Sequence, residues 1–275
     1  MGLRVNSNVS SINAQRNLNN STTGLQKSLQ RLSSGLRITR AADDAAGLAI
    51  SENFRSEVRS LQQAQRNASD GISLLQVGEG ALNETSSILI RLRELAIQSA
   101  NGTLGDRERA TVDLEFQGLL TEIDRIAEVT EFNGNNLIKS TGVTTFQIGA
   151  GNSAQDRFSV SAVDAGVSAL GLGASDVSVS TLTGALSVLN LLDSAVTQVS
   201  SLRATFGTAQ NRLESAIRSI AIAVENTKAA DSRIRDVDFA QETAELTRNQ
   251  VLQQAGVSVL AQANVSTQAA LSLLQ

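Results

Sequence analysis

Few side chains in this sequence could carry out chemistry. The 275 residues include no histidine, cysteine, tyrosine, tryptophan or proline, so no thiol or imidazole is present to bind a metal or act as a nucleophile. Catalysis would need a Ser–Lys arrangement or paired carboxylates. The close acidic pairs are Asp43/Asp44 and Asp236/Asp238, and both lie at predicted helix breaks with no pocket pattern around them. We therefore expect a protein that is not an enzyme and that has no catalytic residue, metal ligand or cofactor.

Nucleotide or nucleic-acid binding is not indicated either. Gly78 and Gly80 lack the third glycine and the strand–turn–helix context of a nucleotide-binding loop, and they more simply relax or tune a long helix. The net charge of −4 gives no reason to expect nucleic acid as a partner. Asp43 and Asp44 have a structural interpretation, because acidic residues favour the N-terminal end of a helix through capping and the helix dipole.

The composition favours long helices. Apolar residues make up 41% of the chain but aromatic residues only 3%, so any core is built from Leu, Ile, Val and Ala. Without proline, nothing forces a helix to stop or kink. Apolar residues near Met1 are scattered among Asn and Ser, so we expect neither a cleavable leader nor membrane insertion. The N-terminal residues include Arg and Ser but no acidic residue, which superficially matches a mitochondrial presequence. A presequence, however, would not need a matching amphipathic segment at the opposite terminus.

Both ends of the chain need a partner. Residues 1–40 carry six basic side chains and no acidic one, and residues 249–275 carry no charge. The first end contains a leucine stripe typical of a coiled-coil seam, formed by Leu18, Leu25, Leu29, Leu32 and Leu36. Ordering some 40 residues costs on the order of 1.5 kcal/mol each, more than burying a few leucines at about 2 kcal/mol each returns. Alone, this strip should be mostly disordered.

At the other end the apolar residues spread around more than one helix face, so that helix needs neighbours on several sides. These residues are Val251, Leu252, Val257, Val259, Leu260, Val265, Leu271, Leu273 and Leu274.

Between the two ends the spacing predicts three further helices. An unbroken seven-residue repeat predicts one helix of about 55 residues, and it comprises Phe54, Leu61, Ala68, Leu75, Leu82, Leu89 and Ala96. This helix should end near the Asn101-Gly102 turn signal, and a shorter one should close at Asn133-Gly134. A third seven-residue repeat comprises Leu192, Val199, Phe206, Leu213 and Ile220, with Val196, Ile217 and Val224 beside it. Three helices with matching stripes can pack as an antiparallel bundle.

Residues 143–181 are rich in Val, Thr, Ser and Gly, and their alternation predicts a β-hairpin that caps one end of the bundle. The fold class is therefore mainly α: a long-helix bundle with a terminal coiled coil and a small β-hairpin region. We expect residues 1–43 and 236–275 to be the two halves of an inner coiled-coil domain. Residues 44–180 should form the N-terminal part of an outer helical domain with the hairpin, and residues 181–235 its C-terminal helix.

Several long runs in this sequence resemble bacterial flagellin. They are QRLSSGLRITRAADDAAGLAIS (30–51), RLRELAIQSANGT (91–103), EIDRIAEVTEFNGNNLI (122–138), FQIG, and the closing QETAELTRNQVLQQAGVSVLAQANVSTQAALSLL. The resemblance covers nearly all of the chain, and with only about 40 non-helical residues in the middle the chain looks core-only. It implies a secreted structural subunit of the extracellular flagellar filament, used for swimming motility, whose paired termini form the inner tube.

The resemblance also implies further partners. These are many identical subunits, hook-associated and cap proteins, and an export chaperone at the C-terminal segment during type III export. The polymerisation residues would be Leu18, Leu25, Leu29, Leu32, Leu36, Val251, Leu252, Val259, Leu260, Val265, Leu271 and Leu274.

Two immune-receptor sites follow from the same resemblance. The patch bound by the vertebrate flagellin-sensing Toll-like receptor corresponds to Arg91, Leu95 and Glu115; in a purely structural role, Leu95 would pack and the other two would form a surface ion pair. Residues 30–51 are similar to the segment recognised by plant receptors and retain Asp43, Asp44, Gly47, Leu48 and Ile50. Thr39-Arg40-Ala41-Ala42 and Ala49 depart from that pattern.

Two alternatives stay open. A flagellar hook–filament junction protein shares the terminal pattern but would form short caps, not long homopolymers. An intracellular coiled-coil scaffold would form a discrete oligomer with structured ends.

Overall fold

The computed structural model describes residues 8–139, 142–173 and 177–272, with side chains described as far as Val265 at the C-terminal end. The chain divides into two compact units, which we call the terminal unit (Met1–Val58 with Glu225–Gln275) and the central unit (Arg59–Val224). The limits fall inside two long helices, so the domain limits expected at the helix breaks stay a prediction. Within the described residues, no helix combines the length and the apolar character needed to cross a bilayer.

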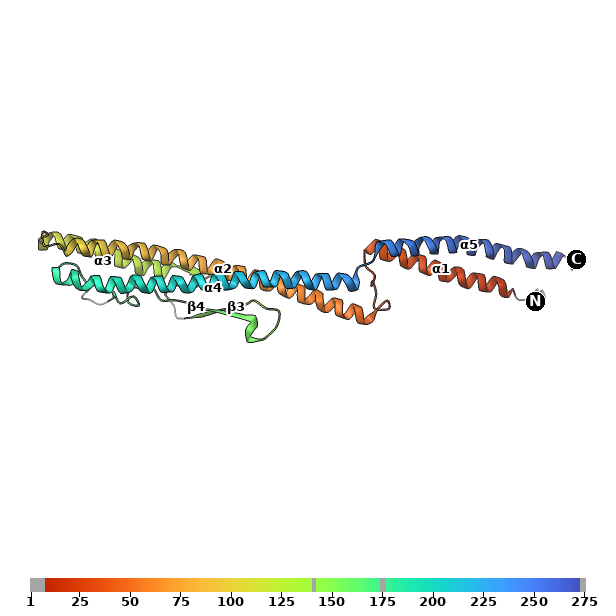
Figure 1. Ribbon diagram of the computed structural model, residues 1–275, viewed down its shortest axis with the longest axis horizontal. Coiled ribbons are helices and arrows are strands. Elements are labelled where there is room, and N and C mark those ends of the chain that lie inside the picture. Colours follow the sequence, from red (N-terminus) through yellow and green to blue (C-terminus); the bar gives the residue numbers. More distant parts are fainter. Residues whose placement is uncertain (1–7, 140–141, 174–176, 273–275) are drawn as a thin grey trace. The chain divides into compact units, whose positions relative to one another are not determined.

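Five α-helices dominate the chain: α1 (Val9–Ser34), α2 (Ala45–Ser99), α3 (Asp106–Val129), α4 (Leu182–Arg235) and α5 (Phe239–Ser272) (Figure 1). The mainly α fold class is confirmed. The predicted long helix is α2, with 55 residues, and it ends just before Asn101 because the Asn101-Gly102 turn follows. The break expected near residues 38–44 separates α1 from α2.

The α2 and α4 repeats form the core of the central unit. Six of the seven predicted α2 positions are buried, and Phe54, which lies in the terminal unit, is half-buried. On α4, Leu192, Val199, Phe206, Leu213 and Ile220 are all buried. The seven-residue spacing therefore identified the inward face of both helices.

Gly78 lies in this core, and the Phe206 ring packs against it. A Cβ added at Gly78 would lie 2.6 Å from Cε2 of the buried Phe206 ring, whereas a Cβ added at Gly80 meets no atom within 4 Å. Gly78 is thus a packing glycine that leaves room for an aromatic ring.

Four short strands follow α3. β1 (Glu131–Phe132) and β2 (Asn135–Asn136) pair across Asn133-Gly134. Both turn residues have positive φ, 52° and 78°, which suits a two-residue hairpin turn and explains the preference for Asn-Gly.

β3 (Val143–Gln147) and β4 (Arg157–Ser161) form the predicted antiparallel hairpin, with Phe146 opposite Phe158 and a short 3₁₀ helix (Ala154–Asp156) in the connection. The expectation that this hairpin caps an end of the bundle is wrong. It lies along the side of the helices (Figure 1), where the Arg212 guanidinium of α4 sits 4.8 Å above the Phe158 ring and Asn67 of α2 donates to the Gln147 carbonyl at 2.9 Å. The buried Phe158 side chain requires a broad helical surface, which an end does not offer.

The described residues between β4 and α4, 162–173 and 177–181, include several that are hydrogen-bonded to α3. Asp113 Oδ1 accepts a hydrogen bond from the Val179 N–H at 2.7 Å, and Asp124 Oδ1 accepts one from Val167 at 2.9 Å. Val167 and Val179 are themselves buried. The two carboxylates therefore satisfy backbone groups that no sheet or helix satisfies.

Candidate functional site

The most informative surface of the terminal unit is the antiparallel pair of α1 and α5. At one end, Asn8 Nδ2 donates to the Ala263 carbonyl at 2.8 Å. At the other, Arg31 Nη1 lies 3.4 Å from Glu242 Oε2. Contacts between residues so far apart in sequence confirm that the two ends of the chain pair with each other.

Small and polar residues make up much of the seam between α1 and α5. The less exposed positions recur at alternating spacings of three and four on both helices, as in a coiled coil. On α1 this series is Ser11, Ala14, Leu18, Ser21, Leu25, Ser28 and Leu32, and on α5 it is Glu242, Leu246, Asn249, Gln253, Gly256, Leu260 and Ala263; beside it, Thr22, Gly24, Arg31 and Glu245 are also partly buried. Only five of these side chains are large and apolar, so pairing within one chain buries little hydrophobic area.

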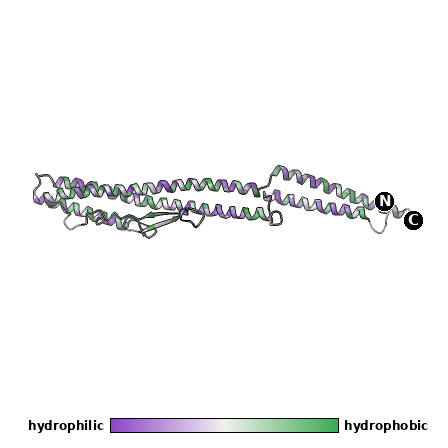
Figure 2. Ribbon diagram, turned by 60° about the horizontal axis from the view of Figure 1, so that its bottom comes forward, coloured by the Kyte–Doolittle hydropathy of each residue, from purple (hydrophilic) through white to green (hydrophobic). Residues whose placement is uncertain are grey.

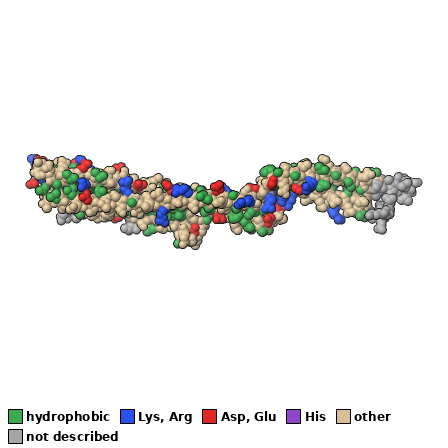
Figure 3. Space-filling model, viewed as in Figure 1, with side chains coloured by type: hydrophobic (Ala, Val, Ile, Leu, Met, Phe, Trp, Pro, Cys, Tyr) green, Lys and Arg blue, Asp and Glu red, His purple; other side chains and the backbone are tan. Residues whose placement is uncertain are grey.

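Larger apolar side chains of the same helices face outward. On α5, Val251 is 58% exposed, Val257 54% and Val259 57%, and on α1 Ile12 is 53% exposed. Val9, Leu29, Phe239, Leu252 and Val265 are comparably exposed. Figure 3 shows hydrophobic side chains on the surface of this pair, and Figure 2 shows hydrophobic residues distributed along both helices. An apolar surface of this kind marks a contact site for another molecule.

The predicted polymerisation residues therefore fall into two sets. Leu18, Leu25, Leu32 and Leu260 lie in the seam and are partly buried. Leu29, Val251, Leu252, Val259 and Val265 are exposed. The placement of Leu29 on the α1 seam stripe is wrong, because the seam passes from Leu25 to the buried Ser28 and then to Leu32.

The remaining three predicted residues lie elsewhere. Leu36 is half-buried in the connection after α1. Leu271 is in α5, at a point where side chains are not described, and Leu274 lies outside the described residues. The sequence reasoning missed the small seam residues Ala14, Ser21 and Ser28, although their own seven-residue spacing is a signal that could have found them.

The two connections at the base of this helix pair are bonded to each other. The Arg37 N–H donates to the Arg235 carbonyl at 2.7 Å, and the Val237 N–H donates to the Gly35 carbonyl at 3.0 Å. The Arg37 guanidinium also donates to the Ile234 carbonyl. Beside them, Ile38 is only 1% exposed. Backbone hydrogen bonds therefore hold the segment that follows α1 against the segment that precedes α5.

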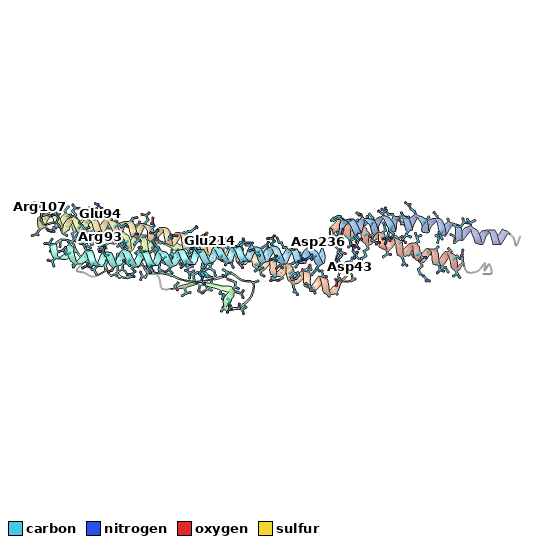
Figure 4. All side chains as sticks on the ribbon, viewed as in Figure 1. Asp43, Arg93, Glu94, Arg107, Glu214 and Asp236 are labelled. Carbon is cyan, nitrogen blue, oxygen red and sulfur yellow. The ribbon has the colours of Figure 1, made fainter. Side chains whose placement is uncertain are left out.

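One member of each acidic pair caps the helix that follows it. Asp44 Oδ1 accepts a hydrogen bond from the Gly47 N–H at 2.8 Å at the start of α2, and Asp238 Oδ1 accepts one from Ala240 at 2.9 Å at the start of α5. Asp43 instead lies 2.7 Å from Lys27 Nζ on α1. Figure 4 labels Asp43 and Asp236 in the two connections.

The charge environment of Asp43 is unusual. Its carboxylate accepts hydrogen bonds from the Thr39 hydroxyl and from the Thr39 and Arg40 N–H groups. The Lys27 ammonium, more than any other neighbour, holds the pKa of the Asp43 carboxyl well below its usual range. Asp43 thus fixes the connection between α1 and α2 as an ionised group.

Comparison with known proteins decides the family. The model of the bacterial flagellin N-terminal helical region matches residues 5–142, and the model of the C-terminal helical region matches residues 189–274. The chain belongs to the bacterial flagellin family.

Individual relatives agree over nearly their whole length. A flagellin of Halalkalibacterium halodurans is 46% identical over 272 residues, which cover 98% of this chain and 99% of the relative. The flagellin of Bacillus subtilis is 42% identical over 308 residues, covering 99% of this chain and all of the relative. This flagellin is therefore core-only, without large inserted domains, and it is a structural subunit that polymerises into the flagellar filament for swimming motility.

A solved flagellin structure agrees with this assignment. The crystal structure of Bacillus cereus flagellin matches with a TM-score of 0.51 and 33% identity, covering 56% of this chain and 88% of that one. A putative flagellar hook-associated protein from Vibrio parahaemolyticus, 16% identical, shares the fold alone, with a TM-score of 0.58 over 70% of this chain and all of that one.

The receptor patch expected in this flagellin lies on α2 and α3 of the central unit. Arg91 Nη2 and Glu115 Oε1 are 2.9 Å apart, and Arg91 also contacts Glu94 at 2.9 Å. Hydrogen bonding to Glu115, and then to Glu94, raises the pKa of Arg91. Leu95 is only 1% exposed. Arg91 and Glu115 thus reach solvent, and Leu95 packs in the core beneath them.

The segment similar to plant-receptor ligands does not form one continuous element. It includes the end of α1, the connection that contains Asp43 and Asp44, and the first turns of α2. Gly47 is buried and Leu48 half-buried, whereas Ile50 is 45% exposed. A Cβ at Gly47 would lie 2.8 Å from Cδ1 of Ile38, so packing alone accounts for this glycine.

Proposed function

We propose that the α1–α5 pair is the inner interface of the filament and that neighbouring copies cover its outward apolar residues. The observation that supports this most is the division of apolar residues between seam and surface. Val251, Val257 and Val259 are more than half exposed, while seam positions such as Asn249 and Gly256 are polar or small. A helix pair that leaves its larger apolar groups in water gains little from pairing alone, and it gains more when further surfaces arrive.

The domain and site assignments belong to this proposal. Residues 1–43 and 236–275 form the inner domain, and residues 44–235 form the outer one. Leu18, Leu25, Leu32 and Leu260 join the two termini of one chain, and Leu29, Val251, Leu252, Val259 and Val265 contact other copies. Leu36, Leu271 and Leu274 belong to the same inner interface. Since these heterologous contacts do not close into a ring, they produce an open helical filament.

Substitution on the outward face of α5 tests this proposal. Val257→Ser and Val259→Ser together remove apolar area without touching the seam, and we expect elongation from filament seeds to slow at least tenfold. Gln254→Ser is the matched control, since it changes an exposed polar residue of the same helix, and it should elongate normally. Unchanged elongation of the valine variant, measured by electron microscopy of seeded samples, would refute the assignment.

We further propose that the subunit leaves the cell through type III export and that a chaperone holds α5 beforehand. The same exposed apolar residues support this, because before assembly they would otherwise promote aggregation. Hook-associated and cap proteins would contact the filament ends. We expect the full-length protein to co-purify with a cytoplasmic partner and a variant that lacks residues 249–275 to lose that partner. Equal capture of the partner by both proteins would contradict the chaperone proposal. We propose no catalytic activity.

Recognition by the vertebrate receptor is a second proposal, supported by the half-exposed side chains of Arg91 and Glu115. The double variant Arg91→Ala with Glu115→Ala should reduce receptor signalling by the monomer. Arg125→Ala, which removes an exposed ion pair with Glu122 on α3, serves as the control. Equal signalling by parent and double variant would argue that the pair is only structural. For the plant-receptor segment we propose no more than packing and capping.

A further inference from the structure

The leucines of the α1 seam cannot by themselves decide how α1 aligns with α5. Leu18, Leu25 and Leu32 recur every seven residues. At the observed register Leu18 lies against Gly256, and Arg31, next to Leu32, contacts Glu242. If α1 slid by seven residues, each leucine of this repeat would move to the place of its neighbour. The hydrophobic pattern is therefore nearly unchanged by such a slide.

Two glycines make the observed register different from the others. The helices contain one glycine each, Gly24 in α1 and Gly256 in α5. A Cβ added at Gly256 would lie 3.3 Å from Leu18 Cδ1, and a Cβ added at Gly24 would lie 3.0 Å from Asn249 Nδ2. Each helix thus offers the other a position without a Cβ, and a side chain fills it.

Glycine at these positions has a cost that calls for a reason. Inside a helix, glycine is less favourable than alanine, and neither residue has the positive φ that would require it. After a seven-residue slide in one direction Gly256 would meet Leu25 and Asn249 would meet Arg31; after a slide in the other direction Gly256 would meet Ser11 and Asn249 would meet Asn17. Asn249 thus loses its glycine partner in both cases, and Gly256 loses its leucine partner in one.

We propose that Gly24 and Gly256 fix the register of α1 against α5. The register in turn determines which exposed apolar residues of α1 lie beside which exposed apolar residues of α5 on the surface that contacts other copies. This inference rests on the proposed inner interface, to which it adds two positioning residues. A filament needs every subunit to present the same surface, and a pair that could slide would present several.

Disulfide trapping measures the register directly, because the native sequence has no cysteine. Ser11 Oγ lies 3.0 Å from Asn264 Oδ1, so Ser11→Cys with Asn264→Cys should cross-link within the chain at the observed register. Ser11→Cys with Val257→Cys should not, because seven helical residues separate the cysteines by about 10 Å along the axis. A disulfide needs Cα atoms within about 7 Å.

In the Ser11/Asn264 cysteine background, Gly24→Ala with Gly256→Ala should lower the cross-linking yield in filaments at least twofold. Leucine at both positions should lower it at least tenfold. Leu18→Ala should restore the yield of a Gly256→Leu variant but not that of a Gly24→Leu variant, a pairing that a general loss of stability would not produce. Gly118→Ala, at a helical position where an added Cβ meets no atom within 4 Å, is the control.

Unchanged cross-linking in the double leucine variant would overturn the inference, as would equal rescue of both glycine sites by Leu18→Ala. The same yields measured on unpolymerised protein separate this inference from the proposed function. Normal elongation of the variant with Val257→Ser and Val259→Ser would put the proposed inner interface at fault, whereas the cross-linking yield still reports the register.

Discussion

Lys27 Nζ and Asp43 Oδ1, 2.7 Å apart, join the last turns of α1 to the connection that leads into α2. The Asp43 side chain is 12% exposed and the Lys27 side chain 49%, so water screens the charge of Lys27 more than that of Asp43. Because the folded pKa of Asp43 is depressed, the pair stabilises the protein above the unfolded pKa of about 3.9. That contribution is lost as the pH falls from there towards the folded pKa.

Lys27→Met keeps the aliphatic stem and removes the charge, so it should lower the stability of the terminal unit by under about 1 kcal/mol at pH 7. The difference from the parent should shrink below about pH 4, because Asp43 then becomes protonated in the unfolded chain while the folded carboxyl is still ionised. Heat-induced dissociation of filaments, followed by light scattering from pH 7 to pH 3, measures it. In an Asp43→Asn background the Lys27 substitution should have little effect at any pH; an undiminished effect there would contradict the pairing.

Gly78 and Gly80 form a natural matched pair in the central unit. Gly78→Ala places a Cβ against the Phe206 ring and should destabilise by about 1–3 kcal/mol, the usual effect of overpacking. Gly80→Ala enters open space and should stabilise by about 0.5–1 kcal/mol through helix propensity. Urea denaturation followed by circular dichroism measures the stability of both variants. Equal effects of the two substitutions would contradict the packing of the Phe206 ring against Gly78.

Arg109 closes the turn between α2 and α3. The residue is 4% exposed, and its Nη2 donates to the carbonyls of Asn101 and Leu104 at 2.9 and 3.1 Å. Losing charged hydrogen bonds of this kind costs about 1.5–3 kcal/mol, so Arg109→Met should lower the unfolding temperature and speed amide exchange in residues 100–105. The exposed neighbour Arg107 (Figure 4) provides the control, since Arg107→Ala should change stability by less than about 0.5 kcal/mol.

The sequence predicted those parts of the fold that follow a regular period. Repeats such as Leu75–Leu82–Leu89 identify the buried face of α2 because seven residues return a helix to nearly the same side. The Asn133-Gly134 turn was also predictable, since both residues need positive φ. By contrast, the position of the β3–β4 hairpin depends on where Phe158 finds a helical surface, and local alternation carries no such information.

The candidate site was predictable in its outline only. The need of both ends for a partner follows from their apolar content, and the family resemblance identifies that partner as other copies. The seam itself was harder to predict, because Ser28 and Gly256 lie where a search for leucines would not look. Leu29 was assigned to the seam since it is apolar and close in phase, yet the smaller Ser28 allows the closer approach of α5.

Amide hydrogen exchange of monomer and filament, compared by mass spectrometry, tests the central claim most directly. If neighbouring copies supply most of the stability of α1 and α5, amides in residues 9–34 and 239–272 should exchange at least a hundredfold more slowly in the filament. Those in the core of the central unit, around Leu82 and Leu213, should change little. Equal protection of α1 and α5 in both states would contradict the account.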